Sequence, residues 1–300
     1  MRKPRPLQRG DLIGIVAPGA AVDAAAVETG ARWLERAGFR VRIGAATLRQ
    51  HGYLAGGDAE RLADLASMFA DDEVRAIIAA RGGYGSGRLL PKLDARVARE
   101  HAKIVVGYSD VTFLLTYLVQ TAGLVAFHGP MVADFEPNPA AAAGLLRLLT
   151  GDHTTWNAAA REIVQPGTAE GIIVGGCLSI LVAGLGTPYA VQTSGRLLFI
   201  EDVNEKAYRI DRMLTQLRHA GKLDEVAGVV FGEMPGCSAP GDAVGVREVI
   251  HEAFADARYP VVFGLPAGHG GVVTLPVGVK ARLAGERLSL LESPLAESAR

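Results

Sequence analysis

The first half of the chain alternates short apolar runs with segments of helical periodicity. Residues 12–17, 74–80 and 103–106 are mainly apolar runs of the length of buried strands. Residues 24–37 and 58–69 repeat their apolar side chains at the spacing of an amphipathic helix. Because strands that alternate with such helices form parallel sheets covered by helices on both faces, we predict that architecture for the first half.

The pattern changes in the middle of the chain. The sequence EPNP at 136–139 interrupts the alternation, and a polar stretch further on ends at residues 165–167. We therefore predict a first domain over residues 1–150, a linker over 151–166 and a second domain over 167–300. The second half is richer in glycine and turns, and its short strand and helix patterns predict a smaller mixed α/β domain.

The composition is that of a folded protein without a strongly charged partner. The chain has 300 residues, of which 49% are hydrophobic and 21% are charged, so it does not have the composition of a disordered protein. Its 31 basic and 32 acidic residues leave a net charge of −1. Because nucleic acids and anionic membranes select a basic excess or cluster, we expect neither as a partner.

Cysteine usage and hydropathy favour a cytoplasmic location. Cys177 and Cys237 do not have the number or spacing of a disulfide framework, so reduced thiols are the simplest interpretation. The N-terminal sequence is basic, but the apolar run that follows it is too short for a signal peptide. Since the chain contains no stretch of 18 apolar residues, we expect a soluble protein without a membrane span.

A serine lies where the pattern predicts a turn from strand to helix. Ser109 follows the apolar run at 103–106 and precedes an apolar helical segment at 110–120. Such a turn exposes the hydroxyl at the carboxyl end of the sheet, where ligands bind in α/β proteins, and directs the next backbone N–H to the same place. The alternative is that Ser109 or Asp110 only caps the helix.

The second half contains candidates for the base and the carboxylate that a serine nucleophile requires. His269 lies among glycines, which suits either a presented side chain or an ordinary loop residue. Glu201 and Asp202 follow an apolar run at 197–200. Because successive strand residues face opposite ways, only one of the two can reach a given site, and the pattern alone leaves that choice open.

No nucleotide or metal motif accounts for these residues. The glycines at 82–87 are out of register with the dinucleotide fingerprint, and no P-loop sequence occurs. His251 and Glu252 look like the start of a zinc-protease helix, but Ala255 stands where the second histidine is needed. We therefore expect no metal and no organic cofactor.

Short motifs along nearly the whole chain together resemble those of the LD-carboxypeptidases, the S66 serine peptidase family of muramoyltetrapeptide carboxypeptidases. The motifs are, in order, Gly10-Asp11 with Ile15-Val16-Ala17-Pro18, Arg81-Gly82-Gly83-Tyr84-Gly85, Gly107-Tyr108-Ser109-Asp110-Val111-Thr112, His128-Gly129-Pro130-Met131, Gly175-Gly176, Phe199-Ile200-Glu201-Asp202, Tyr208-Arg209-Ile210-Asp211-Arg212-Met213-Leu214 and Pro266-Ala267-Gly268-His269. Each motif is short, but the ordered set is highly specific. Two positions depart from the family pattern, since Cys177 stands where asparagine is usual and Gly19 where serine is common.

The resemblance implies a serine triad and an oxyanion hole. The triad would consist of Ser109 as nucleophile, His269 as base and Glu201 as the carboxylate that orients the base. The oxyanion hole would pair the backbone amide of Asp110 with one from the glycine motif, for which we expect Gly83. A glycine suits this place because it lets the backbone approach the substrate closely.

Three further residues are candidates for substrate binding. Arg81 carries a guanidinium that matches a terminal carboxylate, although a structural role that ties loops together is equally open. Tyr84 lies in the same glycine motif. His128 could line the site, but we favour a packing role behind it.

The resemblance implies a cytoplasmic serine carboxypeptidase of murein recycling, which releases the terminal D-Ala from murein tetrapeptides by cleaving an L,D peptide bond. It also implies a Rossmann-like N-terminal domain, a smaller β-rich C-terminal domain and a homodimer. Two alternatives remain open. One is a microcin-immunity member of the same family, which cleaves peptidyl or aminoacyl nucleotide antibiotics; the other is a non-catalytic module that binds a small ligand.

Overall fold

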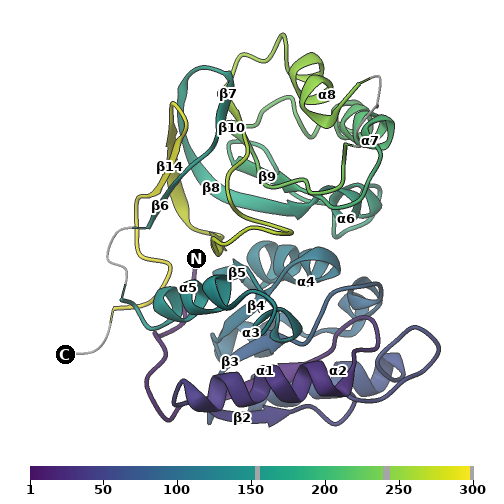
Figure 1. Ribbon diagram of the computed structural model, residues 1–300, viewed down its shortest axis with the longest axis vertical. Helices are drawn as coiled ribbons and strands as arrows, with labels where there is room; N and C mark the ends of the chain where they lie inside the picture. The colour runs from purple at the N-terminus through teal and green to yellow at the C-terminus, as the bar shows by residue number, and fades with distance from the viewer. Residues whose placement is uncertain (153–155, 239–243, 298–300) are drawn as a thin grey trace. The chain divides into compact units, whose positions relative to one another are not determined.

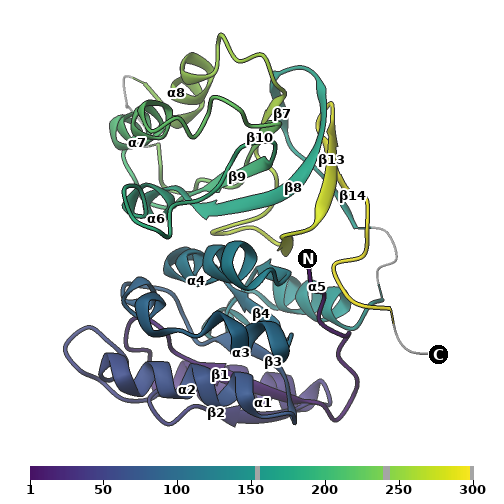
Figure 2. The ribbon, with the colours of Figure 1, turned by 180° about the vertical axis from the view of Figure 1, so that it is seen from behind.

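The chain forms two compact units, each built around its own β-sheet (Figures 1 and 2). The computed structural model describes residues 1–152, 156–238 and 244–297. The division is as follows: Met1–Thr154, Thr274–Pro276 and Pro294–Arg300 belong to the first unit, and Thr155–Val273 and Val277–Ser293 to the second.

The first unit contains a six-stranded sheet with the strand order β12-β5-β4-β3-β1-β2. The strands are β1 (Leu12–Val16), β2 (Arg40–Ile43), β3 (Val74–Ala79), β4 (Ile104–Gly107), β5 (Ala126–His128) and β12 (Leu275–Val277). Strands β1 to β5 pair in parallel. The helices of this unit are α1 (Ala24–Arg36), α2 (Asp58–Ala70), α3 (Ala95–Glu100), α4 (Thr112–Tyr117) and α5 (Pro139–Leu149). Helix α1 covers one face of the sheet, and α2 and α3 cover the other (Figures 1 and 2).

Burial explains why the first half has continuous apolar runs. Every residue of β1 and β4 is buried, because these central strands of the parallel sheet have helices on both faces. Strand β2 lies at the sheet edge, and its residues alternate between exposed and half-buried. Helix α1 begins after Asp23, whose carboxylate accepts a hydrogen bond from the backbone N–H of Ala25 at 3.1 Å.

The second unit contains an eight-stranded mixed sheet with the order β6-β14-β13-β8-β9-β10-β11-β7. The strands are β6 (Asn157–Ala159), β7 (Glu162–Gln165), β8 (Thr168–Cys177), β9 (Leu197–Glu201), β10 (Gly228–Phe231), β11 (Val261–Phe263), β13 (Lys280–Ala284) and β14 (Arg287–Leu290). Strands β8 to β11 are parallel, and antiparallel strands flank them on both sides. The helices are α6 (Leu178–Ala183), α7 (Ala207–His219) and α8 (Val246–Ala253). The predicted fold class, a Rossmann-like parallel sheet followed by a mixed, β-rich domain, is confirmed.

The predicted linker over 151–166 is not irregular throughout. Residues 157–159 and 162–165 form β6 and β7, the two edge strands of the second sheet. Both strands are short and partly exposed, and exposed strand positions need no apolar side chains. Their sequence therefore resembles that of a loop. A further difference from the expected division is β12, which comes from the C-terminal half of the chain but joins the sheet of the first unit.

Lys103, the residue directly before β4, has a buried side chain whose effect on stability can be measured. Its side chain is buried and its ammonium donates a hydrogen bond to the backbone carbonyl of Asp71. Burial lowers the pKa of Lys103 to about 8 from its ordinary value of 10.5, against the opposing attraction of Asp71. Between these two values the unfolded chain holds a proton that the folded protein has lost, so this group adds stability as the pH rises from about 8 to 10.5.

We therefore expect the free energy of unfolding of the unmodified protein to rise relative to that of a Lys103→Met variant over this pH interval. Denaturant unfolding at pH 7, 8, 9 and 10 measures the difference. Lys92→Met, which removes an exposed lysine from the same unit, is the matched control and should show no such trend. If the difference in free energy of unfolding between the unmodified protein and Lys103→Met did not change with pH, burial would not lower the pKa of Lys103.

Candidate active site

Ser109 lies on a tight turn between β4 and α4, and its backbone is strained. Its φ angle is 59°, in a left-handed region that non-glycine residues rarely adopt. A short 3₁₀ turn over Ser109–Val111 leads from this residue into α4. The turn is close, since a Cβ atom on Gly107 would lie 2.6 Å from Val111 Cγ1. A serine presented on a strained strand-to-helix turn is the arrangement of a nucleophile elbow.

The glycine loop, residues 82–86, passes beside the serine side chain. A Cβ atom on Gly82 would lie 2.8 Å from Ser109 Cβ and 2.9 Å from its Oγ, so no larger residue fits at this position. Gly83 has a φ of 103°, which also favours glycine, and it is exposed. The backbone of the loop can therefore approach any group that the serine attacks.

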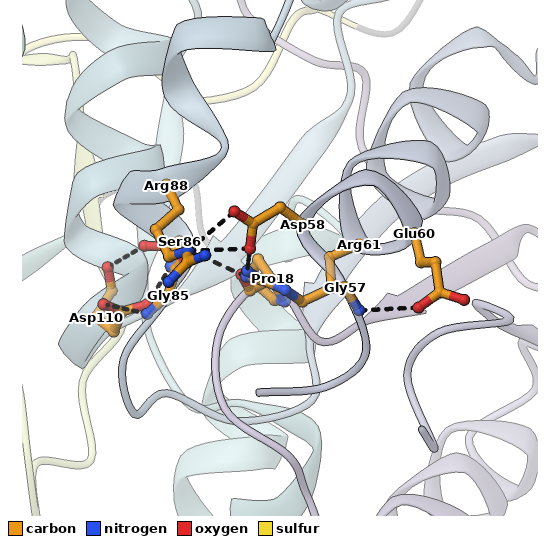
Figure 3. A network of polar contacts seen from close by, with 9 residues as sticks. All are labelled: Pro18, Gly57, Asp58, Glu60, Arg61, Gly85, Ser86, Arg88 and Asp110. Atoms are coloured by element: carbon orange, nitrogen blue, oxygen red, sulfur yellow. Dashed lines mark hydrogen bonds and ion pairs between the residues drawn. The ribbon is translucent and has the colours of Figure 1, made fainter. Parts of the chain in front are cut away.

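Asp110 joins the elbow to the glycine loop through its side chain, a contact that the sequence did not indicate. Its carboxylate accepts hydrogen bonds from the backbone N–H groups of Ser86 at 2.8 Å and Gly85 at 3.3 Å (Figure 3). The Ser86 hydroxyl in turn donates to the Asp110 carbonyl at 2.6 Å. Burial raises the pKa of Asp110, although the hydrogen bonds from Ser86 oppose this effect.

A buried arginine holds the other side of the glycine loop. Arg61, on α2, donates through Nη1 to the carbonyl of Gly85 at 3.0 Å and to the carbonyl of Pro18, and through Nη2 to Asp58 at 2.5 Å (Figure 3). Arg61 lies outside every motif that the sequence analysis connected with the site. The signal was its position on α2, because Arg61 shares the buried face of the helix with Leu65.

In the second unit, Glu201 and His269 form a hydrogen-bonded pair. Glu201 ends β9 and its side chain is 0% exposed, whereas that of His269 is 15% exposed. Glu201 Oε2 accepts from the backbone N–H of His269 at 2.9 Å and lies 2.6 Å from His269 Nδ1. A carboxylate acceptor places the proton of a neutral imidazole on Nδ1, so the lone pair is on Nε2.

A glycine next to the histidine makes this pairing possible. Gly268 has a φ of 96°, and a Cβ atom there would lie 2.6 Å from Glu201 Cγ. The backbone of the histidine loop can therefore rest directly on the glutamate side chain. This close approach explains why His269 lies among glycines.

Asp202 does not bond to the histidine as its neighbour Glu201 does. Its two carboxylate oxygens accept from the backbone N–H groups of Ser179 and Val203, each at 2.8 Å. Burial raises the pKa of Asp202. The alternation between Glu201 and Asp202 thus gives one carboxylate to the histidine and the other to the start of α6.

The departure from the family pattern at Cys177 does not create a second nucleophile. The thiol is buried beside Ser179, with the sulfur 3.2 Å from the Ser179 hydroxyl oxygen. Burial, and then the charge of Glu201, raise the pKa of Cys177 well above its ordinary value. A thiol held in its protonated form is a poor nucleophile.

The three candidate substrate-binding residues lie in different surroundings. Arg81 is exposed and donates to the carbonyl of Ala21 at 3.2 Å. Tyr84 is 56% exposed, and its ring centroid lies 5.8 Å from that of Tyr53, a second exposed aromatic residue that the sequence reasoning did not single out. His128 is fully buried at the end of β5, which favours packing over direct contact with a substrate.

The candidate site residues are divided between the two units. Ser109, Asp110 and Gly83 belong to the first unit, and Glu201 and His269 belong to the second. The Glu201–His269 pair and the contact between the glycine loop and Ser109 are each formed within one unit. Across residues 1–152, 156–238 and 244–297, no group of three His, Cys, Asp or Glu residues is placed to hold a metal ion.

Two family models match the two halves of the chain separately. A family model described as the LD-carboxypeptidase N-terminal domain matches residues 13–129, and one described as the LD-carboxypeptidase C-terminal domain matches residues 170–283. The probable murein peptide carboxypeptidase of Bacillus subtilis is 39% identical over 307 residues, which cover 99% of this chain and 96% of that protein. The matches thus span both units.

Two more distant similarities cover nearly as much of the chain. The solved structure of muramoyltetrapeptide carboxypeptidase from Oxalobacter formigenes has a TM-score of 0.84 at 30% identity and covers 94% of this chain and 99% of that one. The microcin C7 self-immunity protein MccF of Escherichia coli is 27% identical over 314 residues, which cover 92% of this chain and 91% of that protein.

Proposed function

The chain belongs to the LD-carboxypeptidase family of S66 peptidases, which makes it a hydrolase, and we propose that it is a serine carboxypeptidase acting on murein tetrapeptides. The bond to be cleaved joins the L-centre of the diamino acid, meso-diaminopimelate or lysine, to the terminal D-Ala. Support for the substrate class comes from the relatives in Bacillus subtilis and Oxalobacter formigenes, whose names specify murein peptide and muramoyltetrapeptide carboxypeptidases.

The observation that carries the serine mechanism is the Glu201–His269 pair. A buried glutamate 2.6 Å from Nδ1 leaves Nε2 as the basic nitrogen of the imidazole. This is how a general base is prepared for a hydroxyl nucleophile, because the carboxylate both orients the ring and stabilises the imidazolium that forms. We propose that His269 takes the proton from the hydroxyl of Ser109, the residue with the strained backbone.

In the proposed reaction, Ser109 Oγ attacks the carbonyl carbon of the L,D bond while His269 Nε2 takes its proton. The backbone N–H groups of Gly83 and Asp110 donate to the oxyanion of the tetrahedral intermediate. His269 then gives the proton to the nitrogen of the leaving D-Ala, and the C–N bond breaks to leave an acyl-enzyme on Ser109. Water, activated by the same histidine, hydrolyses the ester and restores the serine.

The division of labour between the units is part of the proposal. Residues 1–150 would carry the nucleophile and the oxyanion hole, and residues 167–300 would carry the base and its carboxylate. In the substrate complex, Ser109 Oγ must come within about 2.6–3.2 Å of His269 Nε2 for proton transfer.

We further propose a cytoplasmic homodimer, as the family resemblance implies. The described parts of the chain include no helix with the length and apolar character of a membrane-crossing segment. Light scattering of the purified protein measures the mass in solution, and a value near twice 31.5 kDa is expected.

The substrate's free carboxylate should be essential, because it is what distinguishes a chain end from an internal peptide bond. Arg81 is exposed near the glycine loop and is the side chain that we propose binds it. We expect amidation of the terminal D-Ala to lower kcat/KM by roughly ten- to a hundredfold, because it removes the charge of the acceptor and a hydrogen bond to a charged group contributes about 1.5–3 kcal/mol. Arg81→Ala should lower kcat/KM on the acid and largely abolish the preference for acid over amide.

Steady-state assays of the acid and the amide measure this preference. Arg96→Ala, which removes an exposed arginine outside the glycine loop, is the matched control and should keep this preference. If Arg81→Ala keeps the preference but loses stability, Arg81 is structural and another donor binds the carboxylate.

A second candidate function is the cleavage of peptidyl or aminoacyl nucleotide antibiotics, and it is favoured by the similarity to the microcin C7 self-immunity protein. Mass spectrometry separates the candidates when the pure protein is incubated with murein tetrapeptides, with and without the sugar, and with aminoacyl sulfamoyl nucleosides. Loss of one alanine from the tetrapeptide alone supports the main proposal. Cleavage of the nucleoside conjugate alone supports the second, and binding without any cleavage would support a non-catalytic module.

A further inference from the structure

We propose that Arg61 and Ser86 are positioning residues that fix the separation of the two backbone amides of the oxyanion hole. The inference rests on the proposed function, in which the amides of Gly83 and Asp110 stabilise the oxyanion. It adds two side chains that do not touch the substrate. Their role would be to hold the segments that carry the amides, as Figure 3 shows for the contacts of Arg61, Ser86 and Asp110.

Ser86 and Asp110 connect the two amide-bearing segments directly. Three hydrogen bonds join them: Ser86 N–H and Gly85 N–H to the Asp110 carboxylate, and the Ser86 hydroxyl to the Asp110 carbonyl. Ser86 is 1% exposed and Asp110 is also 1% exposed, so water does not compete for these groups. Gly83 is three residues from Ser86 in the same loop, so we expect a shift at Ser86 to move the Gly83 amide as well.

Arg61 fixes the same loop from the opposite side. Its Nη1 donates to the carbonyls of Gly85 and Pro18, so one nitrogen joins the loop after β3 to the loop after β1. Asp58 accepts from Nη2 and supplies the opposite charge. Arg61 thus acts on the loop, whereas Ser86 acts between the loop and the elbow.

Arg61 contributes hydrogen bonds as well as volume to the packing beneath the loop. Burying a guanidinium is costly unless its donors are satisfied. The side chain of Arg61 is 0% exposed, and both terminal nitrogens, Nη1 and Nη2, have hydrogen-bond partners, whereas the buried Nε has none. An apolar residue at this position of α2 would pack as Leu65 does, but it would leave the carbonyls of Pro18 and Gly85 without this donor. The planar fork of arginine bonds both carbonyls through Nη1 and the carboxylate through Nη2 in a fixed geometry, whereas a lysine has one donor nitrogen at the end of a flexible chain.

The Gly83 side of the loop is packed as well. A Cβ atom on Gly83 would lie 2.4 Å from Ala20 Cβ, and one on Gly85 would lie 2.6 Å from Leu54 Cδ2. One side of the loop is therefore in close contact with Ala20 and Leu54, although Gly83 itself is exposed. A small displacement of a catalytic donor can cost up to about a hundredfold in rate, so the bonds that hold it should be visible in kcat.

The test compares Ser86→Ala and Arg61→Lys with the unmodified protein on a murein tetrapeptide. We expect Ser86→Ala to lower kcat about tenfold and Arg61→Lys about thirtyfold, with KM changed by less than about threefold, because a displaced oxyanion donor costs less than a deleted one. Ser67→Ala is the control, since it removes another hydroxyl-to-carbonyl hydrogen bond, from Ser67 to Asp64 on α2. Its kcat should equal that of the unmodified protein.

A transition-state mimic separates positioning from general loss of structure. A murein tripeptide that ends in a boronic acid forms a tetrahedral adduct, and its Ki should rise in each variant by the factor by which kcat falls. The Kd of the product tripeptide should stay the same. Unchanged kcat and Ki in a folded Ser86→Ala variant would overturn the inference and leave the proposed function standing. An unmodified protein that releases no alanine would overturn the proposed function and the inference together.

Discussion

Replacing Ser109 with alanine is expected to lower kcat for D-Ala release by roughly 10⁴–10⁶-fold, as in other serine triads. The reason is that a methyl group cannot form the acyl-enzyme, while the substrate and the rest of the site are unchanged. Circular dichroism and thermal melting should show an intact fold, because Ser109 is only half-buried and its neighbours do not depend on the hydroxyl for packing. Product mass spectrometry of long incubations measures the residual rate.

A Ser109→Gly variant is the matched companion. It also removes the nucleophile, but glycine accepts the φ of 59° without strain. We therefore expect it to be as inactive as Ser109→Ala and more stable than Ser109→Ala, by on the order of 1 kcal/mol. Full activity in either variant would exclude covalent catalysis by this residue.

Replacing Glu201 with glutamine is expected to lower kcat by roughly 10⁴-fold, because the wrong imidazole tautomer is then favoured. The amide nitrogen of glutamine can donate to His269 Nδ1, and a proton placed on Nε2 by that contact blocks the base. The shape of the site changes little, since the glutamine occupies the same volume in a fully buried position. Steady-state kinetics on the tetrapeptide measure the loss.

Asp202→Asn is the control for this substitution. Asp202 is the neighbouring buried carboxyl, but its oxygens accept from Ser179 and Val203 and not from His269. The variant should lose stability, because an asparagine can accept through only one of its two side-chain heteroatoms. Its kcat should remain close to that of the unmodified protein. Equal losses of kcat in both variants would argue that Glu201 supports the fold and not the base.

Much of the first sheet and its site could be predicted from local patterns. The runs over β1, β3 and β4 are apolar on both faces because helices cover the sheet on both sides, and that pattern is visible in the sequence. The position of Ser109 after such a run predicted a turn at the carboxyl end of the sheet. The φ of 59° at this residue could not be predicted, because the apolar run fits an ordinary helix cap equally well.

The choice between Glu201 and Asp202 shows what local patterns leave undecided. Alternation along β9 predicts that the two carboxylates face opposite ways but does not say which one meets the histidine. The answer depends on a contact with His269, 68 residues further along the chain. The resemblance to the S66 family implied Glu201 as the triad carboxylate, which stays a prediction, and Glu201 is the carboxylate that bonds to His269.

The edge strands and the buried polar network were missed for related reasons. Strands β6 and β7 are partly exposed, so they lack the apolar signal of central strands. Arg61 bonds to residues 43 positions before it and 24 positions after it, and such long-range partners leave no trace in a local pattern. A charged residue on the buried face of an amphipathic helix is the one sign that the sequence offers.

The most direct test of the proposed mechanism is a crystal structure of the Ser109→Ala variant with a murein tetrapeptide bound. We expect the scissile carbonyl carbon to lie within about 4 Å of the Cβ atom of residue 109, and its oxygen to lie within hydrogen-bond distance of the Gly83 and Asp110 amides. His269 Nε2 should face the same Cβ atom. The proposed mechanism would be wrong if the scissile bond of the tetrapeptide lay away from residue 109, or if no domain closure could bring the His269 ring to that residue.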